Sequence, residues 1–269
     1  MNQQCAPYLR MGKGEKSFTL PVLCMLCALI IMAVFLYGPR VLLLCLISCF
    51  TAVACEYGYN KLFRTGTTVW DCSALVTGLI LACLCPASAP YWMPALGSAF
   101  AILFGKMPFG GLGKNLLNPA ALGWGLLAVC FPKIFFQYPS LKSYQFLSFG
   151  NTPEYTAAPS LAAALKDTAL SPQNAFDILL SRISGPLGCT AVLILFACAI
   201  FLLQRKLIHP RIPISFLAAV AVISLLFPRS TNLPLFSLIY ELSAGSLLFC
   251  AVFMATDPVT APKFHCSQI

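Results

Sequence analysis

Charged residues are scarce in this sequence: Asp, Glu, Lys and Arg make up only 9% of its 269 residues. Soluble domains carry roughly 25%, so the shortage excludes a chain that is soluble along its whole length. Hydrophobic residues make up 59%, and apolar runs long enough to span a membrane recur from one end to the other. Composition therefore predicts a polytopic protein whose surroundings are a lipid bilayer.

A basic patch and a signal-peptide cleavage pattern are missing too. The net charge is +9, but the basic residues are scattered between apolar runs, as loop charges are, which excludes nucleic acid as a partner. Arg10, Lys13 and Lys16 precede the first apolar run, which extends from about Thr19 to Tyr37. No small-residue cleavage pattern follows, so we interpret this run as a retained helix.

Metal-ligand spacing is also missing, although the chain has 14 cysteines. Cys24 and Cys27 form one C-x-x-C, which would suit an iron–sulfur or zinc site. There is no second C-x-x-C, and His209 and His265 lack metal-ligand spacing. Most cysteines lie inside apolar runs. We therefore predict no metal site and interpret these cysteines as small apolar residues that pack between helices.

The apolar runs predict an all-α membrane protein, a helical bundle with eight spans. Several spans have only about 15 residues, as in transporter-like folds with discontinuous helices. Between the fifth and sixth spans, residues 132–186 form the one sizeable soluble loop, in which Ser160 to Leu170 suits a helix. The spans lie at about 19–37, 41–58, 72–86, 91–105, 116–131, 187–203, 213–227 and 240–256.

Loop charges predict the orientation in the membrane. With the N-terminus in the cytoplasm, the inner side holds eleven basic residues: Arg10, Lys13, Lys16, Lys61, Arg64, Lys106, Lys114, Arg205, Lys206, Arg211 and Lys263. The outer side holds six: Arg40, Lys133, Lys142, Lys166, Arg182 and Arg229. Four of these six lie in the long loop, where the rule is weak. The bias favours a cytoplasmic N-terminus and an extracytoplasmic 132–186 loop.

An internal repeat divides the chain. After a shift of 172 residues, "LILACLCPASAP" (Leu79–Pro90) falls on "AVFMATDPVTAP" (Ala251–Pro262), so that three positions are identical and Ser88 matches Thr260. Both segments end the third span of a half, and the two spans run in opposite directions, which indicates an inverted-topology repeat. We predict a first repeat of five spans over 1–131, the loop over 132–186, and a second repeat of three spans over 187–269 that lacks its last two.

The densest polar motif is "GKMPFGGLGKNLLNPAALG" (Gly105–Gly123). It is no phosphate loop, because Asn115 follows Lys114 where Ser or Thr is required, and Pro108 takes the place of the leading Gly. It forms either a tight cytoplasmic turn or a re-entrant segment whose polar groups face a bound molecule. In the second case the site residues are Gly110, Gly111, Gly113, Asn115 and Asn118.

A second polar stretch, Thr256-Asp257-Pro258, ends the last apolar run. An acid there is costly unless it is paired or wetted, so Asp257 would pair with Lys263 or Lys114. The alternative is a plain interfacial acid that caps the start of a helix. Asp71 is its counterpart in the first half, and Glu56 is a weaker candidate for an ion path.

These stretches carry a resemblance to a known family. "DCSALVTGLILACLCP" (Asp71–Pro86), "FGGLGKNLLNPAALG" (Phe109–Gly123), "RIPISFL" (Arg211–Leu217) and "FMATDPVTAP" (Phe253–Pro262) resemble the D subunit of the Rnf electron-transport complex. The B subunit of the sodium-translocating NADH:quinone reductase is related. The resemblance implies a bacterial plasma-membrane protein with no catalytic residue of its own. With the other subunits it helps to move electrons between ferredoxin and NAD while Na⁺ or H⁺ is pumped.

The resemblance also implies two flavins, a non-covalent riboflavin and an FMN linked to a threonine in the outer loop. This chain reads "EYTAAPSLAAAL" (Glu154–Leu165) where the family has Gly-Ala-Thr. Ser160 is then the one hydroxyl that could accept FMN, and Pro159 and Ala158 stiffen the backbone before it. We expect covalent FMN to be absent or scarce. The eroded motif and missing spans leave two alternatives: an inactive, truncated copy, or a solute channel on the same fold.

Overall fold

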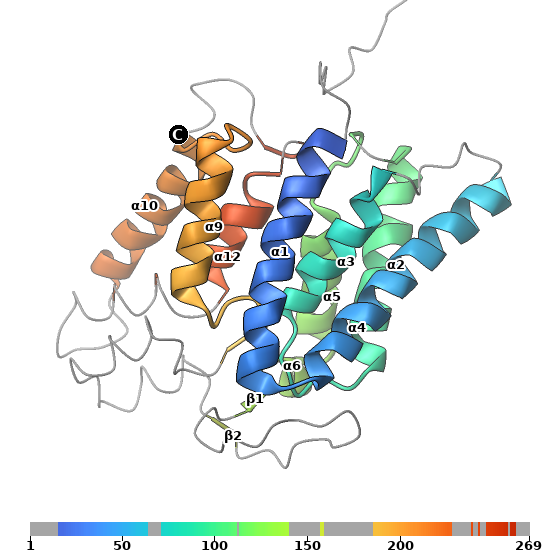
Figure 1. Ribbon diagram of the computed structural model, residues 1–269, viewed down its shortest axis with the longest axis horizontal. Coiled ribbons are helices and arrows are strands. Elements are labelled where there is room, and N and C mark those ends of the chain that lie inside the picture. The colour runs from blue at the N-terminus through green and yellow to red at the C-terminus, as the bar shows by residue number, and fades with distance from the viewer. Residues whose placement is uncertain are drawn as a thin grey trace, which may run out of the picture.

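The computed structural model describes residues 16–63, 71–111, 113–139, 157–158, 185–227, 238, 242, 246–257 and 259–261. Over these residues the chain is a bundle of helices (Figure 1). The exception is one antiparallel pair of two-residue strands, β1 (Tyr138–Pro139) and β2 (Ala157–Ala158). The all-α prediction is therefore confirmed for the described residues. Ser160 and the helix expected over 160–170 lie outside them.

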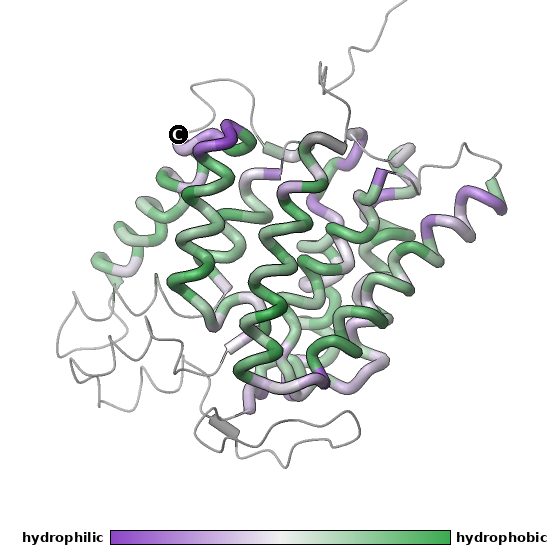
Figure 2. Tube along the Cα trace, viewed as in Figure 1, coloured by the Kyte–Doolittle hydropathy of each residue, from purple (hydrophilic) through white to green (hydrophobic). Residues whose placement is uncertain are grey.

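Apart from the four-residue helix at Pro132–Phe135, which lies in the expected soluble loop, the helices fall on the expected apolar runs. Two of them, Phe18–Tyr37 and Arg40–Phe63, are long and apolar enough to cross a membrane, and four shorter ones are also apolar. Figure 2 shows hydrophobic residues along most of the length of the helices, and the most polar residues lie toward the upper end of the bundle, as expected of a bundle surrounded by lipid. The helices are α1 (Lys16–Tyr37), α2 (Arg40–Phe63), α3 (Ser73–Leu84), α4 (Trp92–Phe100), α5 (Pro119–Cys130), α6 (Pro132–Phe135), α9 (Val192–Gln204), α10 (Arg211–Leu226) and α12 (Leu247–Phe249).

Two of these helices change their hydrogen-bonding pattern part-way along. After α4 the chain continues as a π-helix, η2 (Ala101–Lys106), and then as a 3₁₀ turn, η3 (Met107–Phe109). After α12 it continues as a second π-helix, η5 (Cys250–Met254). Such π segments are rare and frequently mark functional sites. Both lie directly before the polar motifs that the sequence singled out.

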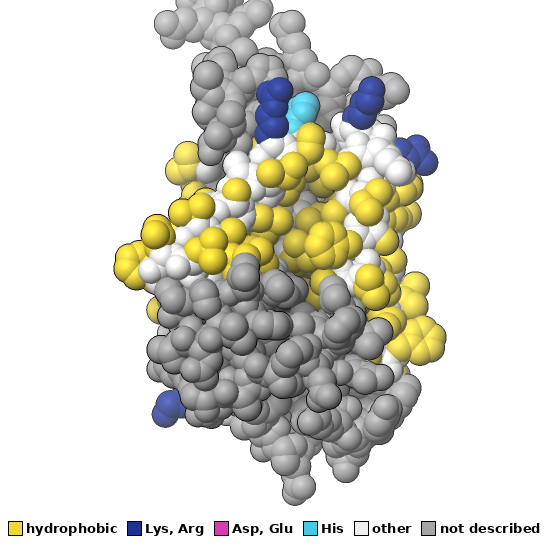
Figure 3. Space-filling view, turned by 90° about the vertical axis from the view of Figure 1, so that its left-hand side faces the viewer, with side chains coloured by type: hydrophobic (Ala, Val, Ile, Leu, Met, Phe, Trp, Pro, Cys, Tyr) yellow, Lys and Arg dark blue, Asp and Glu magenta, His cyan; other side chains and the backbone are white. Residues whose placement is uncertain are grey.

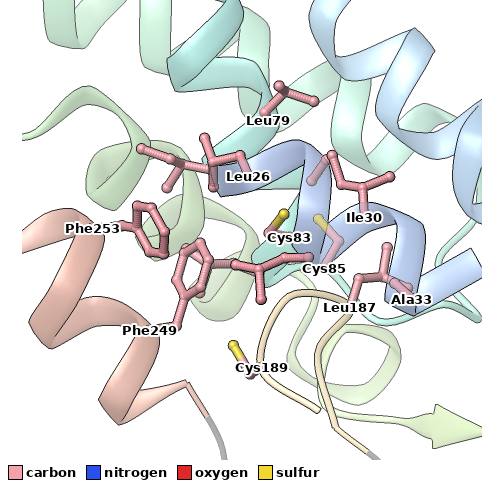
Figure 4. Packing of buried hydrophobic residues seen from close by; sticks show 14 of the residues in the cluster. Leu26, Ile30, Ala33, Leu79, Cys83, Cys85, Leu187, Cys189, Phe249 and Phe253 are labelled. Atoms are coloured by element: carbon pink, nitrogen blue, oxygen red, sulfur yellow. The ribbon is translucent and has the colours of Figure 1, made fainter. Parts of the chain in front are cut away.

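A hydrophobic core joins the two halves of the chain. The segment after the outer loop lies against the end of α3, because Gly188 N–H donates to Cys83 O at 2.7 Å and Leu187 N–H donates to Cys85 O at 3.1 Å. Around this contact Leu26, Phe249 and the free thiols of Cys83, Cys85 and Cys189 pack together (Figure 4). The thiols fill space in the core, as small apolar side chains do.

Arg40 and Lys106 correct one part of the orientation argument, which counted both as loop charges. Each side chain is only 1% exposed. Arg40, the first residue of α2, donates to Ala87 O at 3.2 Å and to Ala89 O at 3.0 Å, in the break that follows α3. Removing one charge from each side leaves ten basic residues against five, so the bias still favours a cytoplasmic N-terminus.

The two proline-containing breaks lie at opposite ends of the bundle. The break after α3 meets Arg40, at the end where α2 begins. The break after η5 lies at the other end, since Met254 O accepts from Asn118 at the start of α5. In Figure 1 these are the lower and upper ends of the bundle. Helix α3 and the α12–η5 segment therefore run in opposite directions.

Candidate functional site

The glycine motif forms a series of tight turns between η3 and α5. Gly110 N–H donates to Met107 O at 3.1 Å, and Gly111 N–H donates to Lys106 O at 3.3 Å. Gly110, Gly111 and Gly113 have φ of 102°, 89° and 87°, a conformation that side chains disfavour and glycine accepts. Gly111 is buried, yet a Cβ added to it would meet nothing within 4 Å. The turns thus leave open space beside buried backbone.

Asn118 holds the start of α5. Its Oδ1 accepts hydrogen bonds from Ala120 N–H at 3.0 Å and from Ala121 N–H at 3.4 Å, while Pro119 occupies the first helical position. This is the usual arrangement of an N-cap followed by proline. Two of the helix-end amides are therefore satisfied by the chain itself. The Asn118 Nδ2 is left to contact another element.

That other element is η5. Asn118 Nδ2 donates to Met254 O at 3.4 Å, across 136 residues of sequence. Nearby in the sequence, Asn115 has a buried Oδ1 that accepts no hydrogen bond among the described residues. A buried amide oxygen without a donor is costly, so a group outside the described residues, either from the rest of the chain or from a ligand, is expected to supply one.

Asp257 organises the turn that follows η5. Its Oδ1 accepts from Val259 N–H at 3.2 Å, and its Oδ2 accepts from the Thr260 hydroxyl at 3.4 Å. Burial raises the pKa of this carboxyl, and the two hydrogen bonds partly offset the rise. Within the described part of the chain Asp257 forms no ion pair with Lys114, and Lys263 lies outside it. Thr256 donates to Val252 O of η5.

The structure therefore brings the two predicted polar stretches to one end of the bundle, where Asn118 and Met254 touch. The glycine turns lead into that contact, and Thr256 and Asp257 follow it by two and three residues. The cofactor-binding role of Gly110, Gly111, Gly113, Asn115, Asn118, Thr256 and Asp257 stays a prediction. Among the described residues no group of three His, Cys, Asp or Glu side chains is placed to hold a metal.

The sequence indicated Glu56 as a weaker candidate for an ion path, but its partner Lys106 was counted as a loop charge. Lys106 Nζ lies 2.8 Å from Glu56 Oε1, and both side chains are 1% exposed. The same Nζ donates to the Ser73 hydroxyl at 2.7 Å. The sequence offered one signal for this pair: Lys106 directly follows the predicted span 91–105, and Glu56 lies near the end of the predicted span 41–58.

An apolar helical bundle with polar turns at one end defines a helical membrane protein. The comparisons narrow that class: residues 2–269 match the model of the NQR2, RnfD, RnfE family. The chain belongs to this family, and the resemblance inferred from its motifs is confirmed.

Several relatives are D subunits of ion-translocating complexes. The chain is 29% identical over 273 residues to the D subunit of the proton-translocating ferredoxin:NAD(+) oxidoreductase complex of Clostridium ljungdahlii, covering 98% of this chain and 80% of the relative. It is 30% identical over 266 residues to the D subunit of the Na(+)-translocating ferredoxin:NAD(+) oxidoreductase complex of Acetobacterium woodii, covering 98% and 79%. The D subunit of the ion-translocating oxidoreductase complex of Pseudomonas aeruginosa is 34% identical over 248 residues, covering 84% and 70%.

Proposed function

We propose that this chain is the D subunit of an Rnf-type complex, which couples electron transfer between ferredoxin and NAD to the translocation of Na⁺ or H⁺ across the bacterial plasma membrane. The relatives' names support this function and the presence of other subunits as partners. The structural observation that supports it most is the Asn118–Met254 contact, because it joins the two most specific motifs of the family resemblance. One relative is named for proton translocation and another for Na⁺ translocation, so membership of the family does not decide which of the two cations is moved.

The turns suit a ligand that carries an N–H or O–H donor. The buried Asn115 Oδ1 offers an acceptor, and there is open space beside Gly111. We propose riboflavin as this ligand, with Asn115 as its polar partner; when bound it would supply electron transfer in one-electron or two-electron steps. A covalent FMN would attach in the outer loop, where Ser160 is the remaining acceptor; that residue lies outside the described part of the chain.

The function is tested by deleting the gene for this chain and restoring it in variant forms. Membranes of the deletion strain are expected to lose ferredoxin-dependent NAD⁺ reduction, and the wild-type chain to restore it. Asn118→Asp keeps the oxygen that caps α5 but loses the donor to Met254 O. Asn118→Ala loses both, which costs the helix about 1 kcal/mol for the cap alone. We expect the amount of assembled complex to decrease from the wild type to Asn118→Asp, and further to Asn118→Ala.

Two results would contradict the assignment. One is a deletion strain whose ferredoxin-dependent NAD⁺ reduction equals that of the wild type. The other is a purified, affinity-tagged chain that brings down no further membrane subunit. A solute channel would give the first result together with altered uptake of its solute.

We further propose a multi-pass protein with a cytoplasmic N-terminus and an inverted repeat. The opposite directions of α3 and the α12–η5 segment support the repeat, while the count of eight spans stays a prediction. Figure 3 supports a lipid-facing side: apolar side chains cover the middle of this face, and basic side chains gather at its upper edge. Arg205 and Lys206 belong to the connection between α9 and α10, and Arg211 begins α10; all three are exposed.

This orientation has a direct test. Alkaline phosphatase inserted between residues 140 and 175 is expected to be active, because that loop would lie outside, where the enzyme folds. The same enzyme fused after His209 is expected to be silent, because the α9–α10 connection would lie in the cytoplasm. Activity measured in whole cells, normalised to the amount of fusion protein, distinguishes the two. An active His209 fusion with a silent loop fusion would reverse the map.

A further inference from the structure

A buried ion pair is left without a role by the function proposed above. The pair is formed by Glu56 of α2 and Lys106, the last residue of η2, and it is joined by Ser73, the first residue of α3. Apolar residues that lie close to the pair in sequence, Ala52, Ala74, Ile102 and Met107, form a small buried cluster of their own, against which Cys55 and Tyr59 pack. Three elements of the first half therefore converge on two opposite charges.

Stability does not explain this pair. Removing a carboxylate and an ammonium from water costs several kcal/mol for each ion, and their attraction roughly repays it only when the geometry is excellent. Two well-packed apolar side chains would be as stable or more stable. Ionisable side chains inside a membrane protein instead tend to mark the path of an ion.

The pair is connected to the site at the end of the bundle. Lys106 O accepts the hydrogen bond from Gly111 N–H, so the backbone that carries the ammonium also forms the first of the glycine turns. Lys106 also ends the π-helix η2, a segment type that recurs at functional sites. The glycine turns and the Lys106 ammonium are therefore linked through one backbone segment.

Oxygen ligands continue from the pair into the bundle. The Thr77 hydroxyl donates to Ser73 O at 3.0 Å, one turn along α3, and the Ser48 hydroxyl donates to Gly78 O at 2.7 Å. Ser48 lies two turns before Glu56 on the same buried face of α2. Carboxylate, hydroxyl and carbonyl oxygens are the ligands that hard cations prefer.

We propose that the Glu56 carboxylate, with the Ser73 hydroxyl, binds the monovalent cation that the complex moves, and that the Lys106 ammonium occupies this place as an internal counter-ion when the cation is absent. Exchange of one positive charge for another keeps the buried carboxylate neutralised at every stage. The ammonium sits on a flexible four-carbon stem, which lets it leave the carboxylate while its backbone stays in place. This inference rests on the function proposed above.

The test uses the whole complex and three variants: Lys106→Met, the double variant Glu56→Gln/Lys106→Met, and Lys61→Met as a control. Lys61 is an exposed lysine near the end of the same helix α2. Cation uptake into inverted vesicles is measured during ferredoxin-dependent NAD⁺ reduction, against Na⁺ concentration and against pH. The amount of assembled complex is measured for each variant.

Each variant has a distinct expected result. Lys106→Met removes the competitor, so the cation concentration that gives half-maximal rate is expected to fall by about tenfold or more. The double variant removes both charges together, so it is expected to assemble normally and yet to lose cation uptake. Lys61→Met is expected to behave as the wild type. A double variant that assembles and transports like the wild type would overturn the cation site, because it would show that the two charges have only a structural role and can be replaced together.

A second measurement needs no variant and covers the case in which the double variant does not assemble. A hydrophobic carbodiimide is applied to the wild-type complex, and modification of Glu56 is quantified by peptide mass spectrometry. Protection by Na⁺ over choline at equal ionic strength identifies a sodium site. Modification that rises on acidification and ignores Na⁺ identifies a proton site. Modification that is absent, or indifferent to both cations, refutes the proposal.

Failure of this inference is separable from failure of the proposed function. Wild-type vesicles that show no cation uptake linked to ferredoxin-dependent NAD⁺ reduction contradict the function of the whole complex. Wild-type vesicles that do show it, beside a double variant that keeps it, contradict only the role of Glu56 and Lys106.

Discussion

Replacing Arg40 by Met is expected to destabilise the folded protein strongly. The guanidinium satisfies Ala87 O and Ala89 O, the free carbonyls of the break after α3, and it lies 4.5 Å from the centre of the Tyr91 ring. Each buried carbonyl left without a donor costs about 1–3 kcal/mol. Two such carbonyls together cost about 2–6 kcal/mol, which is a large part of the net stability of a domain, about 5–15 kcal/mol. The measurement is thermal unfolding of the purified protein in mild detergent, beside its yield in membranes.

Arg211 supplies the matched control. It also begins an apolar helix, α10, but its side chain is exposed. Arg211→Met is therefore expected to change the unfolding midpoint far less than Arg40→Met. Arg40→Lys is expected to fall between them, because one ammonium cannot reproduce the fork that reaches two carbonyls. Equal midpoints for Arg40→Met and Arg211→Met would contradict the role of Arg40.

The location of the helices could be predicted from sequence because a bilayer leaves the chain little choice. Backbone groups in hydrocarbon must be satisfied within the segment, so an apolar run of sufficient length becomes a helix. The expected span at 19–37 is contained in α1, and the expected span at 41–58 is contained in α2. Each helix can be recognised from the composition and hydropathy of its own segment, without knowledge of a distant partner.

Whether the charged residues are buried or exposed to water could not be predicted in the same way. Positive residues near helix ends are usually loop charges, and this rule placed Arg40 and Lys106 in water. Their burial depends on partners about 50 residues away, since Lys106 meets Glu56 and Arg40 meets Ala87. Nothing in the local sequence fixes such a pairing, because it is decided by which helices lie side by side.

The candidate site likewise has one part that the local sequence predicts and another part that only the fold determines. The cap on α5 is local, since Asn118, Pro119 and the first amides of the helix adjoin in sequence. A helix start at this place follows from the sequence alone. The contact of Asn118 with Met254 is not local, and only the fold brings η5 to the glycine turns. The family motifs indicated that both stretches matter, and the structure gives the reason that they act at one place.

The second large effect is expected from the close approach of α4 and α5. Gly123 faces α4 so closely that an added Cβ would lie 2.6 Å from Gly97 O, a backbone atom that cannot rotate away. Small residues at such positions allow helices in a membrane to pack together. Gly123→Ala must separate the two helices, and overpacking of this kind costs about 1–3 kcal/mol. A lower unfolding midpoint and a lower yield of assembled complex are expected.

Replacing Gly by Ala two residues further along, at Gly125, is expected to have the opposite effect on the stability of the protein. A Cβ added at Gly125 would meet nothing within 4 Å, and Ala is favoured over Gly inside a helix by about 0.5–1 kcal/mol. Both variants gain this intrinsic preference on the same helix, so the difference between their unfolding free energies isolates the contact with Gly97. Gly125→Ala should therefore unfold at or above the wild-type midpoint while Gly123→Ala unfolds below it. If both substitutions shift the midpoint equally, α4 and α5 do not approach each other as closely as the structure has them.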